Sequence, residues 1–120
     1  NVTQETTHLY GCTEPDIDTI ASSISPALDL QLENRDSAYW GDYHIDRSGA
    51  FSELKLYRNL DPMFSSDADD PDEYWFEPDF RDCDALLSVY AAESVLLDFH
   101  RRIANVTPKF RLLKPSPIGT

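Results

Sequence analysis

The sequence predicts an α+β fold in which a mainly antiparallel sheet of about five strands carries two helices packed on one face. Two segments have apolar residues at helical spacing, and several others alternate apolar with polar residues as strands do. At 120 residues, with 41% hydrophobic and 12% aromatic residues, the chain is long enough for one core and too short for two ordinary domains. We therefore treat residues 1–120 as a single domain with a tail at residues 115–120.

The first predicted helix spans residues 13–25. We expect Thr13 to be its N-cap, with Asp16 in the position from which a carboxylate completes a capping box. The apolar residues that follow share one helix face: Ile17, Ile20, Ala21 and Ile24. Pro26 lacks the N–H that would continue the helix, so we expect the helix to end near Ser25.

Three strands are expected next. Residues 27–33 alternate leucines with polar residues, which is the period of a half-buried strand. Residues 39–46 and 51–58 are two aromatic, alternating segments, and the short connection between them contains Gly49, which can adopt a positive φ. These two segments are therefore predicted to form a hairpin.

The last third of the chain predicts a strand, a helix and a strand. Residues 84–92 are rich in apolar and β-compatible side chains, as expected for a strand buried on both faces. A helix then begins at Glu93 or Ser94, with its apolar residues at helical spacing: Val95, Leu96, Phe99 and Ile103. Residues 109–114 are the final short strand. A crossover through this helix would make the strands on either side of it parallel.

Residues 61–84 form a segment that we call the acidic aromatic loop. It contains ten acidic residues and one basic residue, a net charge of −9 in a chain whose net charge is −12. Three prolines exclude long regular structure. The same segment holds five large rings: Phe64, Tyr74, Trp75, Phe76 and Phe80.

This combination has two interpretations. The loop is either a charge-rich solvated connection whose rings fold back onto the edge of the sheet, or a binding surface. In the second case the rings anchor a partner while the acids attract its Lys and Arg side chains. We favour the binding surface, because the predicted helices and strands supply a core without these rings. The residues assigned to partner binding are Asp67, Asp69, Asp70, Asp72, Glu73, Tyr74, Trp75, Phe76, Glu77 and Asp79.

The sequence predicts no catalytic, metal or cofactor site. Residues 67–73 are rich in carboxylates, but they lack the glycine and glutamate spacing of an EF-hand, and Pro71 interrupts them. The three histidines, His8, His44 and His100, have no partner at zinc spacing. No serine lies in a nucleophile-elbow context, and no glycine-rich phosphate loop is present. We therefore expect a protein that is not an enzyme.

Net charge, cysteine content and the lack of a long apolar run indicate which partners and which cellular location to expect. A strongly negative field repels nucleic acid and anionic membranes and attracts a basic protein. Cys12 and Cys83 are too few to indicate a secreted disulfide scaffold, so we expect two reduced, buried thiols. The sequence contains neither an apolar run of roughly 18 residues nor a signal-peptide pattern, which indicates a cytoplasmic chain.

As a whole, the pattern resembles small bacterial proteins in which a helix precedes segments such as "RDSAYWGDYHIDR" and "FSELKLYRNLDP", followed by an acidic segment with "EPDF". Over residues 13–113 it looks like the immunity proteins of contact-dependent growth inhibition and related polymorphic toxin systems. That resemblance implies a cytoplasmic inhibitor of a cognate toxin domain, for which we expect a basic nuclease, and no catalytic residues. Two alternatives remain: an acidic nucleic-acid mimic that inhibits a restriction or CRISPR effector, and a small metal-dependent enzyme.

Overall fold

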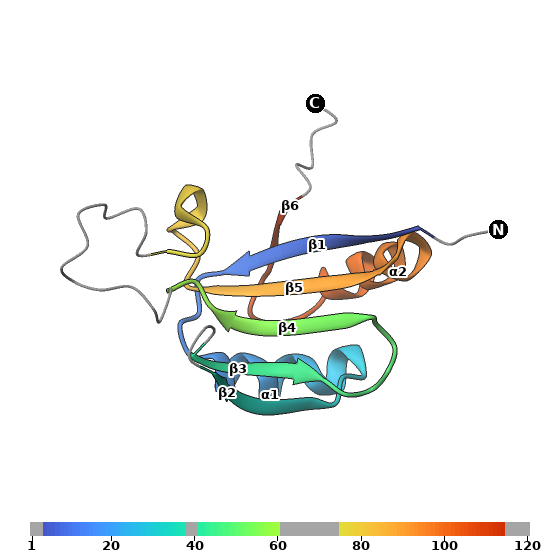
Figure 1. The fold of residues 1–120 in the computed structure, drawn as a ribbon, viewed down its shortest axis with the longest axis horizontal. Coiled ribbons are helices and arrows are strands. Elements are labelled where there is room, and N and C mark those ends of the chain that lie inside the picture. Colours follow the sequence, from blue (N-terminus) through green and yellow to red (C-terminus); the bar gives the residue numbers. More distant parts are fainter. Residues whose placement is uncertain (1–3, 38–40, 61–74, 115–120) are drawn as a thin grey trace.

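A computed structural model describes residues 4–37, 41–60 and 75–114, which form a six-stranded sheet with two helices (Figure 1). This confirms the predicted α+β class, with six strands where the sequence predicted about five. In chain order the elements are β1 (Glu5–Cys12), α1 (Ile17–Leu28), β2 (Leu32–Ser37), β3 (Gly41–Asp46), β4 (Glu53–Arg58), a 3-10 helix (Pro78–Phe80), β5 (Ala85–Ala92), α2 (Glu93–Ile103) and β6 (Arg111–Lys114).

The strand order across the sheet is β2-β3-β4-β5-β1-β6, and every neighbouring pair is antiparallel. β5 and β6 both run antiparallel to β1, which lies between them, so the two strands that flank α2 point in the same direction, as the predicted crossover requires. The β3–β4 hairpin is confirmed, and Gly49 in its connection has a φ of 83°. Residues 39 and 40 of the predicted strand lie outside the described residues.

β1 is the element that the sequence analysis missed. Its first three residues are exposed and polar, so its sequence has no clear alternation, and only Leu9, Tyr10, Gly11 and Cys12 are buried. Two layers enclose this half of the strand: α2 on one face and the chain around Cys83 on the other. A strand buried on both faces at only one end gives a weak periodic signal.

Helix α1 differs from its prediction at both ends. Its N-cap is Asp16, not Thr13: the Asp16 carboxylate accepts hydrogen bonds from the backbone N–H groups of Asp18 and Thr19. The helix passes through Pro26 and ends after Leu28, which is almost completely buried. A proline in the last turn removes one backbone hydrogen bond, and burial of a leucine side chain, worth about 2 kcal/mol, offsets that loss.

The strand predicted at residues 27–33 was also wrong. Leu28 belongs to α1, Leu30 lies in the connection after the left-handed cap at Asp29, and β2 begins only at Leu32. Leu28 and Leu30 are buried, so the apolar positions were identified correctly. Their spacing of two arose from a helix end followed by a tight turn, a geometry that imitates strand alternation.

Both helices cover one face of the sheet, and two apolar clusters form on the two faces. The larger cluster lies between the helices and the sheet and includes Leu87, Val89 and Phe99. The smaller cluster lies on the other face and consists of Leu9, Tyr57, Cys83, Leu86 and Leu113. β5 contributes to both clusters, as predicted for a strand buried on both faces.

The two cysteines are free and buried, as predicted, and they belong to different clusters. Cys12 lies in the larger cluster beside the helices, and Cys83 in the smaller one. The sheet therefore separates two thiols whose backbones are adjacent, since the Asp84 N–H donates to the Cys12 carbonyl at 2.9 Å.

Burial of two titratable side chains in β1 makes stability depend on alkaline pH. Burial raises the pKa of Tyr10 to about 12 and that of Cys12 to about 11. A raised pKa in the folded state means that the folded chain holds the proton more tightly than the unfolded chain does. Both groups therefore contribute stability that is fully present below about pH 9, the ordinary pKa of a cysteine thiol and the lower of the two ordinary values. That contribution is lost as pH rises from about 9 to 12.

We therefore expect the urea concentration at the unfolding midpoint to decrease as the pH is raised from 8 to 11. In the Tyr10→Phe variant this decrease should be smaller than in the parent chain. Tyr90→Phe is the matched control, because the Tyr90 ring is 40% exposed. If the urea midpoint depended on alkaline pH equally in the Tyr10→Phe and Tyr90→Phe variants, Tyr10 would not be a source of that dependence.

Candidate protein-binding surface

The ten residues predicted to bind a partner divide into two groups. Six of them lie outside the described residues: Asp67, Asp69, Asp70, Asp72, Glu73 and Tyr74. The structure describes the other four: Trp75, Phe76, Glu77 and Asp79. These four belong to residues 75–84, which we call the loop base, between the isolated bridge at Trp75 and the start of β5.

A single buried amide, Asn59, organises the loop base. Asn59 directly follows β4 and is completely buried. Its Nδ2 donates to the carbonyl oxygens of Phe80 and Cys83, both at 3.0 Å, and its Oδ1 accepts from the Glu77 N–H at 2.8 Å. The Asn59 backbone also bonds to Phe76 and Asp84. One side chain thus satisfies backbone groups along the length of a segment that has almost no regular structure.

An antiparallel bridge between Leu60 and Trp75 lies next to this anchor. The chain therefore leaves the described sheet at Leu60 and returns to it at a neighbouring position. The acidic residues between them are attached to a fixed base formed by the end of β4, Asn59 and the loop base.

The rings of the loop base are partly used inside the molecule. Phe76 packs edge-on against Tyr57, with ring centroids 5.5 Å apart, and both Phe76 and Phe80 pack on the smaller apolar cluster. The core is therefore not complete without Phe76, contrary to the expectation from the sequence. Trp75 is half-buried. The partner-binding assignment of these rings stays a prediction.

The acids of the loop base differ in their surroundings. Glu77 forms an ion pair with Lys114 at 2.8 Å. Asp82 receives two hydrogen bonds from Arg111, at 3.0 and 3.3 Å, and these bonds hold the pKa of the Asp82 carboxyl below its usual range. Asp79 is exposed in the 3-10 helix. Of the two acids assigned to binding in this segment, Asp79 therefore presents its charge to solvent more fully than Glu77.

More acids lie at the same end of the molecule, where β1, β2 and β4 end and α1, β3 and β5 begin (Figure 1). Asp16 and Asp18 occupy the start of α1, and Asp36 lies directly opposite Asp42 in the β2–β3 ladder. We call this region, together with the loop base, the acidic end. Asp16, Asp18, Asp36 and Asp42 were not recognised as one group from the sequence, because they are scattered along the chain and only the sheet topology brings them to one end.

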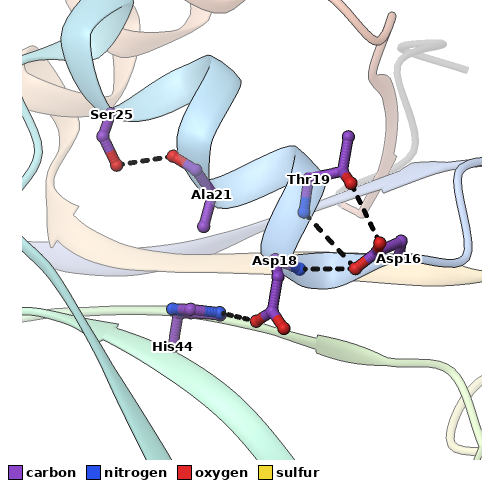
Figure 2. Close-up of polar contacts among 6 residues, drawn as sticks. All are labelled: Asp16, Asp18, Thr19, Ala21, Ser25 and His44. Atoms are coloured by element: carbon purple, nitrogen blue, oxygen red, sulfur yellow. Dashed lines mark hydrogen bonds and ion pairs between the residues drawn. The ribbon is translucent and has the colours of Figure 1, made fainter.

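His44 contacts one of these acids and lies near another. It lies in β3 beneath the first turn of α1, and its Nε2 is 2.8 Å from Asp18 Oδ1 (Figure 2). The alternation of β3 places Asp42 and His44 on the same face of the sheet. That signal was present in the sequence, but the position of Asp18 above it was not.

Comparison with protein families, with curated proteins and with solved structures found no match to this chain. Within residues 4–37, 41–60 and 75–114, no three His, Cys, Asp or Glu side chains are placed to hold a metal ion. Within the same ranges, no helix is long and apolar enough to cross a membrane.

Proposed function

We propose that the chain is a cytoplasmic immunity protein that binds and neutralises a basic toxin domain, for which a nuclease is the expected class. The observation that carries the proposal is the concentration of charge: residues 61–84 hold ten acids and one base. Further acids at the start of α1 and in the β2–β3 ladder lie at the same end of the molecule. A net negative charge at one end of the molecule orients and accelerates the approach of a basic partner.

The way in which the loop is attached supports the same proposal. Asn59 and the Leu60–Trp75 bridge hold the described residues on either side of residues 61–74, and Phe76 packs against Tyr57. A binding segment whose ends are already fixed loses less conformational entropy when it binds, so more of its contact energy appears as affinity.

A nuclease binds phosphates in a basic groove, and a carboxylate-rich loop presents negative charge to the same groove. Inhibition then follows from occlusion of the groove, and no reaction by the inhibitor is required.

The test uses a toxin domain encoded by a gene adjacent to that of this chain. Simultaneous change of Asp69, Asp70 and Asp72 to Asn and of Glu73 to Gln should lower the association rate constant at low salt by about tenfold and weaken its salt dependence. The matched control removes four acids outside the acidic aromatic loop, three at the starts of β1, β4 and α2 and one in the middle of α2: Glu5, Glu53 and Glu93 are changed to Gln and Asp98 to Asn.

Trp75→Ala should act mainly on the dissociation rate, because a ring that anchors a partner contributes after docking. Protection of growth on co-expression with the toxin should follow the measured affinities. The proposal is abandoned if the loop variant and the control variant associate equally fast, or if the parent chain gives no protection.

A further inference from the structure

A shallow hollow of about 330 Å³ lies between α1 and the β2–β3 pair, away from the acidic aromatic loop in sequence. It is lined by Asp18, Ala21, Ser22 and Ser25 of α1, Leu32 of β2 and His44 of β3. We call it the α1–β3 hollow. Figure 2 shows four of these residues, Asp18, Ala21, Ser25 and His44, between the helix and the strands below it.

The His44 imidazole holds one hydrogen-bonding atom that the described chain does not use. Its side chain is only 10% exposed, and Nε2 donates to the Asp18 carboxylate. In the neutral ring this tautomer makes Nδ1 an acceptor. Nδ1 is buried without a hydrogen-bond partner among the described residues, and Figure 2 places it on the ring edge away from Asp18. An unmatched buried polar atom costs free energy and requires a reason.

The other polar groups of the hollow are also acceptors. Ser25 donates its hydroxyl hydrogen to the Ala21 carbonyl at 2.6 Å, which leaves only lone pairs on Oγ for another group. The Asp18 side chain is 75% exposed and uses Oδ1 for His44, so Oδ2 is open to solvent. Ser22 adds a hydroxyl that can accept. A set of acceptors around a carboxylate suits a cation with several donors.

Two further carboxylates lie beside the hollow. Asp36 and Asp42 face each other across β2 and β3, and Asp42 is two residues from His44 on the same strand face. Like charges directly opposite in a ladder destabilise the pair. A cation bound in the hollow would be attracted by these two carboxylates.

We propose that the α1–β3 hollow binds an arginine side chain of the basic partner, as a second contact separate from the acidic aromatic loop. A guanidinium group has five donors in a rigid plane and can meet acceptors in different directions at once, which an ammonium group does less well. This inference rests on the proposed function in that the same partner supplies the arginine.

The test needs no toxin. N-acetyl-arginine methylamide is titrated into the ¹⁵N-labelled chain, and the NMR signals of the His44 ring nitrogens and of the Ser22 and Ser25 amides are followed. We expect saturable shifts confined to the hollow, with the largest at His44 Nδ1. N-acetyl-citrulline methylamide, which has a similar shape and no charge, should bind at least about tenfold more weakly, because charge-assisted hydrogen bonds are lost.

Two variants and one control locate the site. Asp18→Asn keeps an acceptor for His44 and removes the charge, so affinity for the arginine probe should fall about tenfold. Ser22→Leu fills the hollow at an exposed position without changing the charge, and should abolish the His44 shifts. Asp98→Asn on α2 removes the same charge far from the hollow and should leave binding unchanged.

Equal weakening by Asp18→Asn and Asp98→Asn, or shifts spread over all exposed acids, would overturn the inference and indicate nonspecific charge attraction. If the arginine probe does not bind in the hollow, the effect of the loop variants on toxin association can still be observed. If the loop variants do not change toxin association, binding of the probe to the hollow can still be observed. The two proposals therefore fail separately.

Discussion

Replacing Asn59 with Asp is expected to lower the free energy of unfolding by about 3–5 kcal/mol. The substitution keeps the volume of the side chain but removes the Nδ2 donors, and it places a carboxylate against the carbonyl oxygens of Phe80 and Cys83 in a fully buried site. Asn59→Ala should cost less, about 2–3 kcal/mol, because it leaves the carbonyls without donors and adds no charge.

Urea unfolding followed by tryptophan fluorescence measures both Asn59 variants, since Trp75 lies in the segment that Asn59 anchors. Asn105→Asp is the matched control at an exposed position and should change stability by no more than about 0.5 kcal/mol. If Asn59→Asp were as mild as the control, the hydrogen bonds of Asn59 would not be what holds the loop base.

Gly11→Ala is expected to cost about 1–3 kcal/mol, because β1 and the loop base approach each other too closely for a side chain at this position. A Cβ on Gly11 would lie 2.7 Å from Cys83 Sγ, 2.8 Å from Leu113 Cδ1 and 3.0 Å from Cys83 Cβ. These contacts are shorter than van der Waals distances, so either β1 or both Cys83 and Leu113 must move.

A double-mutant cycle identifies which contact matters. Cys83→Ala removes the sulfur, so the Gly11→Ala/Cys83→Ala chain should be more stable than the sum of the single effects predicts, by about 1 kcal/mol. The free energies come from the same urea titrations. Strict additivity would show that the sulfur contact does not determine the cost of a side chain at Gly11.

Sequence periodicity predicted the elements whose faces differ consistently along their length. α2 buries Leu96, Phe99 and Ile103 at helical spacing and was located to within about a residue at its start. β5 is a continuous apolar run and was correctly placed inside the sheet. In both cases each residue's environment follows from its own position in a regular element.

The errors arose where tertiary contacts outweighed local signals. Pro26 is an ordinary stop signal, yet burial of Leu28 carries α1 past it. β1 is buried only where α2 and the loop base cover it, and its sequence does not contain that information.

At the candidate binding surface, too, the contacts between residues distant in sequence could not be predicted from local patterns. The acidic aromatic loop is recognisable from composition, because its charges are neighbours in the chain. From the sequence, Asn59 is only a polar residue after a strand. Its role depends on the backbone groups of Glu77, Phe80 and Cys83, which the fold brings to its side chain. The pairing of Asp18 with His44 joins residues 26 positions apart and depends on how α1 packs on β3.

The position of β1 also determines when the sheet can be assembled. β1 is synthesised before the other five described strands, yet its two neighbours are β5, which ends at Ala92, and β6, which ends at Lys114. During translation, residues 5–12 must wait for most of the chain before either edge finds hydrogen-bond partners, whereas β2, β3 and β4 pair with strands close in sequence. We therefore expect the β2–β4 meander to form early and the insertion of β1 to set the folding rate.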